Sequence, residues 1–128
     1  MPLNHQSYTD KLFICNLYDR VNEEDARRWA ELGKAYADRE QYPLIALLDL
    51  QQVTYVTAIA RRIFARASDR DHLHIVAVAT SDFVVEQNMR LTAMMSASKC
   101  LYVFTSWQDA QQHARHHAHL LNENLSWR

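Results

Sequence analysis

The stretch Leu44-Ile45-Ala46-Leu47-Leu48-Asp49-Leu50 decides the fold that this sequence predicts. Apart from one aspartate it is apolar, and its apolar side chains fall on both alternating faces of an extended chain. A strand of this kind is typical of the middle of a parallel sheet, where helices cover both faces. We therefore expect residues 44–50 to form the central strand of a sheet.

Further apolar runs lie on both sides of this stretch and alternate with longer amphipathic segments. The runs cover residues 12–18, 74–79 and 101–104. Several of the segments between and after them open with residues that favour helix N-caps, namely Asn22, Ser81-Asp82 and Ser106. This alternation indicates strands joined by crossover helices, and hence a largely parallel sheet.

The sequence predicts one α/β domain over residues 1–128, with a mostly parallel sheet of four or five strands and about four helices packed on it. Residues 1–10 are expected to form an arm or a short edge strand. The last helix is expected to run to about Leu121, followed by a tail over residues 122–128.

The apolar positions of each expected helix indicate which face packs on the sheet. In the first helix, which Pro43 should end, they are Ala26, Trp29, Ala30, Gly33, Tyr36 and Ala37. In the second they are Val56, Ile59, Ala60, Ile63, Phe64 and Ala67, with Arg61, Arg62 and Arg66 in solvent. In the third the stripe is Val84, Asn88, Leu91 and Met95. The methionines of this third helix offer an alternative, an adaptable apolar surface for a partner, a lipid or a second copy.

Composition excludes several classes of function. The 14 basic and 15 acidic residues give a net charge of −1, which does not favour nucleic-acid binding. With one glycine, the chain has no glycine-rich phosphate loop. It also lacks an apolar run of membrane-spanning length and a signal peptide at its start, so we expect a cytoplasmic protein. Cys15 and Cys100 lie in apolar segments, which favours buried, reduced thiols.

Three stretches of the chain resemble the STAS domain, the sulfate-transporter and anti-sigma-factor-antagonist family with its SpoIIAA-like relatives. They cover residues 47–56 (LLDLQQVTYV), 75–79 (IVAVA) and 103–110 (VFTSWQDA), and the likeness extends over residues 11–121. The resemblance implies a non-enzymatic regulatory module that associates with a protein partner or with itself as a homodimer. A regulatory kinase or a sigma-pathway component is the kind of partner that it implies.

The sequence departs from the family at the phosphoacceptor. Where switch proteins of the family have Asp-Ser-Ser-Gly, this chain has Thr57-Ala58-Ile59-Ala60, so Ile59 occupies the phosphoacceptor position and cannot be phosphorylated. Thr54 and Thr57 keep hydroxyls nearby, and either a displaced phosphosite or a helix cap at Thr57 is compatible with the pattern. The resemblance implies that the interaction site is Thr54, Tyr55, Thr57, Ile59, Arg61 and Arg62.

Hydroxyl side chains recur where the expected parallel strands end. They are Thr54 and Thr57, Thr80 and Ser81, and Thr105 and Ser106. Strand ends of this kind share one edge of the sheet, where helix N-termini favour anions. This pattern supports an alternative function, a carrier or sensor of a small amphipathic or anionic ligand that would contact Thr80 and Ser81. The same hydroxyls are equally typical of helix caps.

Histidines crowd the last expected helix, and His113 and His117 stand four residues apart on one face. Two imidazoles can contribute to a zinc site, but a site needs further ligands, and the helix offers no cysteine or glutamate before Glu123. A solvated polar face is the alternative. No nucleophile, base and orienting group stand together in the sequence, so we expect neither an enzyme nor a cofactor.

Overall fold

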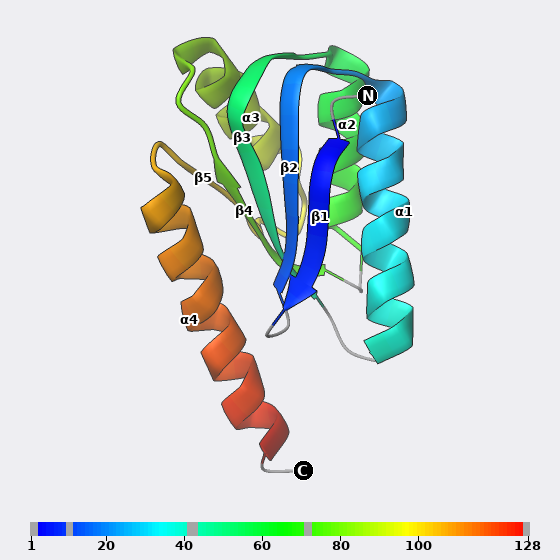
Figure 1. Ribbon diagram of the computed structural model, residues 1–128, viewed down its shortest axis with the longest axis vertical. Coiled ribbons are helices and arrows are strands. Elements are labelled where there is room, and N and C mark those ends of the chain that lie inside the picture. Colours follow the sequence, from blue (N-terminus) through cyan, green and yellow to red (C-terminus); the bar gives the residue numbers. More distant parts are fainter. Residues whose placement is uncertain (1–2, 10–11, 41–43, 71–72, 127–128) are drawn as a thin grey trace.

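The computed structural model describes residues 3–9, 12–40, 44–70 and 73–126. Over these residues the chain forms strands and helices in alternation (Figure 1). The strands are β1 (Leu3–Thr9), β2 (Leu12–Val21), β3 (Leu44–Val56), β4 (Leu73–Ala79) and β5 (Leu101–Phe104). The helices are α1 (Glu23–Glu40), α2 (Ala58–Ser68), α3 (Phe83–Met95) and α4 (Trp107–Ser126). Pro43, expected to end the first helix, lies outside the described residues.

The strands form one sheet in the order β1-β2-β3-β4-β5. β2, β3, β4 and β5 are parallel, and β1 pairs antiparallel with β2 at the edge. The α/β fold and the central place of residues 44–50 are therefore confirmed. Residues 3–9 form the edge strand that was one of two expectations for the N-terminal segment.

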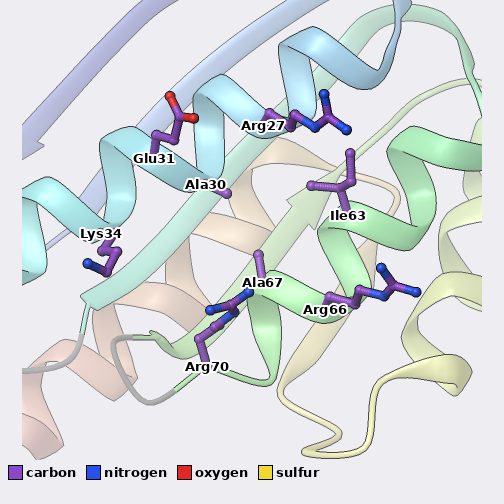
Figure 2. Close-up of a pocket in the computed structure, with 8 residues that line it drawn as sticks. All are labelled: Arg27, Ala30, Glu31, Lys34, Ile63, Arg66, Ala67 and Arg70. Atoms are coloured by element: carbon purple, nitrogen blue, oxygen red, sulfur yellow. The ribbon is translucent and has the colours of Figure 1, made fainter.

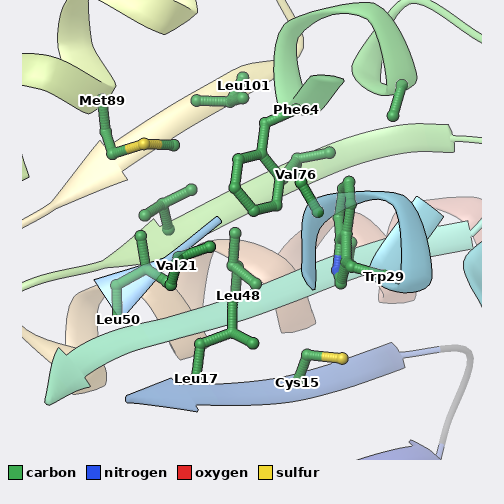
Figure 3. Close-up of a cluster of buried hydrophobic side chains, with 14 of the residues drawn as sticks. Cys15, Leu17, Val21, Trp29, Leu48, Leu50, Phe64, Val76, Met89 and Leu101 are labelled. Atoms are coloured by element: carbon green, nitrogen blue, oxygen red, sulfur yellow. The ribbon is translucent and has the colours of Figure 1, made fainter. Parts of the chain in front are cut away.

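Helices cover the two faces of the sheet unequally. The connecting helices α1, α2 and α3 lie on one face and α4 lies on the other (Figure 1). Each face of the sheet has its own hydrophobic core, and we call the one under α1, α2 and α3 the first core. In the first core, the Trp29 ring meets the Phe64 ring edge-on, with the ring centroids 5.1 Å apart (Figure 3). On the other side, Ile45 and Leu47 of β3 pack with three alanines of α4, namely Ala110, Ala114 and Ala118.

Local signals in the sequence set the helix starts. The backbone N–H of Asp25 donates to Asn22 Oδ1 and that of Asn22 donates to Asp25 Oδ2, both at 3.0 Å, which is a reciprocal cap. The expected cap at Thr57 is present, since its Oγ1 accepts from the backbone N–H of Ala60 at 3.1 Å. Ser106 Oγ accepts in the same way from the N–H of Asp109 at 3.0 Å. Each bond satisfies a backbone donor that the first helical turn leaves free.

Two expectations about element length are wrong. The strand expected over residues 44–50 is longer and continues as β3 as far as Val56, which was expected in the second helix. The strand continues because β2 also runs on, to Val21, and Val21 pairs with Val56 while Asp19 pairs with Val53. Both valines of β3 are buried in the first core. α4 also runs further than expected, to Ser126 rather than about Leu121.

The expected core face of α3 is wrong. Val84, Leu91 and Met95 are each more than half exposed, whereas Val85 and Met89 are fully buried. The helix is therefore rotated by about one residue, or 100°, from the expected orientation. The expectation that Ile59 packs in the core is also wrong, because its side chain is half exposed.

Both cysteines are buried and free, as expected. Burial raises the pKa of the Cys15 thiol to about 12, so the thiolate is suppressed at neutral pH. Among the residues described, no helix combines the length and the apolar character needed to cross a bilayer.

Candidate functional site

Five of the six hydroxyls expected at the carboxyl edge of the sheet, those of Thr54, Thr57, Thr80, Ser81 and Ser106, are bonded to the chain's own backbone. Thr54 donates to the carbonyl of Asp19 at 3.4 Å, and Ser81 donates to the carbonyl of Gln51 at 3.1 Å. Thr80 is buried, and its Oγ1 accepts from the N–H of Asp82 at 3.3 Å. The bonds of Thr54 and Ser81 join β3 to β2 and to the segment after β4, and the bond of Thr80 lies in the turn before α3, so each of the three hydroxyls has a structural role.

The side chains at the start of α2 are divided between surface and interior. Tyr55 and Ile59 are exposed, and the Arg20 guanidinium lies over the Tyr55 ring, 4.9 Å from its centroid. Arg62 is exposed. Arg61 is partly buried instead, and its Nη1 lies 3.4 Å from Asn88 Oδ1 of α3, which links the two helices. Thr54, Tyr55, Ile59 and Arg62 are therefore the exposed members of the expected interaction site.

More than half of the exposed large apolar side chains among the described residues belong to α3. Five large side chains of this helix are between 55% and 72% exposed, namely Phe83, Val84, Leu91, Met94 and Met95. We call these five residues the α3 face. Exposed apolar groups gathered on one element are typical of interaction surfaces, whereas single ones are ordinary. The sequence pointed to this helix through its methionines, but it did not single out Phe83.

Polar contacts hold the opposite side of α3 in place. Thr92 donates to the carbonyl of Asn88 at 2.8 Å, so its buried hydroxyl is satisfied within the helix. Ser96, just after the helix, donates to Asp69 Oδ1 at 2.7 Å. The same carboxylate accepts from the N–H groups of Ala97 and Ser98 at 3.1 and 2.8 Å. The end of α2 is thereby tied to the end of α3, and these hydrogen bonds, with that from Ser98 first, hold the Asp69 pKa well below its usual range.

Three histidines of α4, His113, His116 and His117, form a cluster of rings in tilted and edge-on contact. The rings of His113 and His117 are 4.6 Å apart, and Tyr102 and Phe104 of β5 contact His113 at 4.7 and 5.2 Å. Burial, followed by the charge of His116, lowers the pKa of His113. Within the described part of the chain, no three His, Cys, Asp or Glu side chains are grouped so that they could hold a metal ion.

Comparison with known proteins gives a likeness in structure. No protein-family model and no curated protein matches the sequence. The structure is similar to the crystal structure of an uncharacterised protein of the DUF3478 family from Shewanella loihica, described as having a SpoIIAA-like fold. The two chains share 14% identity with a TM-score of 0.57, and the likeness covers 86% of this chain and 90% of the other. The chain therefore has the SpoIIAA-like fold that its resemblance to the STAS domain predicts.

Proposed function

We propose that this chain is a non-enzymatic protein-interaction module of the STAS type that pairs with a second copy of itself through the α3 face. The observation that carries the proposal is the exposure of five large apolar side chains on one helix of 13 residues. Removing such a surface from water stabilises an association by roughly 25 cal/mol for each Å² buried, before the entropic cost of binding is subtracted.

The pattern of the α3 face favours a second copy as the partner. Val84 and Leu91 are seven residues apart, which is the spacing of equivalent positions in paired helices. In an antiparallel pair, the Phe83 end of one helix meets the Met94 end of the other. Large apolar groups then face large apolar groups toward both ends of the contact, with the exposed Gln87 near its middle, and the same surface serves both copies as an isologous dimer requires.

The charges around the α3 face are also self-complementary. Asp82, which caps the helix, and Glu86 lie at its amino-terminal half, and Arg90 and Lys99 lie toward its carboxyl-terminal end; within one copy Glu86 and Arg90 already pair at 2.9 Å. Antiparallel pairing places the acidic half of one copy beside the basic half of the other and aligns the two helix dipoles favourably.

A phosphorylation switch at the family position is not part of this function, because Ile59 has no hydroxyl. The hydroxyl of Thr57, the residue that caps α2, accepts the capping bond from the N–H of Ala60. We propose that protein concentration, rather than phosphorylation, controls dimerisation. The exposed start of α2 would then lie beside the two paired α3 helices.

Sedimentation velocity over a wide range of protein concentration tests this proposal. We expect a dimer for the native chain, and a monomer for Met94→Glu and for Leu91→Glu, because each places a charge in the apolar contact. Leu120→Glu is the matched control, since Leu120 is an exposed apolar residue on α4 and its change should leave the dimer intact.

Two results contradict the proposal. A native chain that stays monomeric at every concentration would exclude the second copy as partner. A dimer that persists in both Met94→Glu and Leu91→Glu would show that the contact does not involve the α3 face. If only Ile59→Glu then gave a monomer, the contact would lie at the start of α2.

A further inference from the structure

The positive charge of this nearly neutral chain is concentrated along α2. The helix contains Arg61, Arg62 and Arg66 and no acidic residue, and Arg70 follows two residues after its end. Arg62 and Arg66 are spaced four apart, so they project along one side of the helix, and Arg70 follows in the turn after it. Like charges at this spacing repel one another, and a bound anion relieves that repulsion.

Two of these arginines border a groove between α1 and α2, with a volume of about 330 Å³ (Figure 2). Its floor is apolar, because Ala30 of α1 and Ile63 and Ala67 of α2 point into the gap between the helices. The rim is cationic and carries the side chains of Arg27, Lys34, Arg66 and Arg70. The one carboxylate among the lining residues, that of Glu31, points away from α2 in this view.

The two sides of the groove differ in how their charges are satisfied. On α1, Arg27 pairs with Glu23 and Lys34 pairs with Asp38 one helical turn away. On α2, neither Arg66 nor Arg70 makes a side-chain hydrogen bond or ion pair with any residue whose placement the structure describes. The α2 side therefore offers two guanidinium groups, which are the side chains best suited to hold carboxylates in a bidentate manner.

We infer that this groove binds an acidic, amphipathic segment of a partner protein, with its carboxylates on Arg66 and Arg70 and its apolar side chains on the floor. The recessed floor favours a polypeptide, because Ala30 and Ala67 are reached by a side chain that projects into the groove. A lipid surface binds apolar groups that protrude from the protein. The groove lies on the α1 side of α2, whereas Arg61 links α2 to α3 on the other side. This site is thus separate from the α3 face and does not depend on the proposed dimer.

Fluorescence anisotropy with a labelled model peptide tests the inference. The peptide carries glutamate on one face of a helix and leucine on the other, and a scrambled peptide of the same composition serves as its control. We expect the native chain to bind the patterned peptide more tightly than the scrambled one, and to lose affinity as salt screens the charges. Arg66→Gln/Arg70→Gln should weaken binding by about tenfold or more, since both bidentate partners are lost.

Matched variants separate the groove from general electrostatics. Arg28→Gln/Arg115→Gln removes the same charge from exposed positions outside the groove and should leave the affinity within about twofold. Arg66→Lys/Arg70→Lys keeps the charge but not the bidentate geometry, so it should restore only part of the binding. Circular dichroism checks that each variant is folded.

Three results would overturn the inference. Equal binding of the patterned and scrambled peptides would show that only charge is recognised, and an equal loss in the two glutamine variants would show that the groove is not the site. Binding to phosphatidylserine vesicles that requires Arg66 and Arg70, without binding to the peptide, would assign the groove to a membrane surface.

Discussion

The orientation of α3 can be tested by truncating two methionines of the same helix. Met89 is fully buried and Met94 is 70% exposed, although they stand only five residues apart. Met89→Ala removes the thioether and its flanking carbons from the first core, whereas Met94→Ala removes the same atoms from solvent. The pair keeps the chemistry and the helix constant and changes only the burial.

The expected magnitudes are well separated. A buried Met→Ala change costs about 2 to 5 kcal/mol, because the lost transfer free energy is joined by the cost of the cavity. For a domain of this size that corresponds to a fall in Tm of roughly 6 to 20 °C. Met94→Ala should change the free energy of unfolding of the monomer by less than about 0.5 kcal/mol.

Urea unfolding followed by circular dichroism measures both variants, at two protein concentrations. The effect of Met89→Ala should be independent of concentration, since its cavity lies inside one chain. The effect of Met94→Ala should grow with concentration if this residue lies in the dimer contact. Equal losses for the two variants at low concentration, or a larger loss for Met94→Ala, would refute the orientation of the helix.

Three further changes test the polar contacts. Asp69→Asn should lower the free energy of unfolding by about 1 to 3 kcal/mol at pH 7. Because the folded state depresses the Asp69 pKa, this difference should shrink as the pH falls below the ordinary value of about 3.9, which urea unfolding at several pH values measures. The lowered His113 pKa means that the unfolded chain takes up the proton first. Native stability should therefore decline as the pH falls below about 6.5, and thermal melts of His113→Phe should show a smaller decline. Thr57→Ala should cost about 1 kcal/mol through loss of the cap, and Thr57→Ser should recover most of it in the same melts; an unchanged Tm would contradict the capping role.

The sequence predicted the sheet because the signals for its strands are unambiguous. Residues 44–50 are apolar on both faces, and this pattern fits a central parallel strand better than any surface element. α3 was misjudged because both of its sides look plausible as a core. Leu91 is more apolar than Thr92, yet Thr92 is buried, since its hydroxyl is satisfied by a helix carbonyl. The bond from Ser96 to Asp69 spans 27 residues, and periodicity within one helix contains no information about it.

The candidate sites could be predicted from the sequence only in part. The resemblance to the STAS domain predicted an interaction site at the start of α2, where Tyr55 and Ile59 are exposed. The groove was missed because Arg66 was interpreted as an ordinary solvated side chain. The absence of acidic residues from α2 was a usable signal, but only the packing of α1 beside it shows that the arginines border a groove.

The order of the strands has a consequence for how the chain folds during synthesis. Each strand lies beside its predecessor in the sequence, so β1 through β5 can add to the sheet one at a time as they leave the ribosome. The three-helix face is covered along the way by α1, α2 and α3. The other face is covered only by α4, the last element to be synthesised. Until α4 packs, Ile45 and Leu47 are exposed to water and can contact other nascent chains. We therefore expect a chain that is truncated before Trp107 to aggregate, because all five strands are present but one apolar face of the sheet has no helix packed on it.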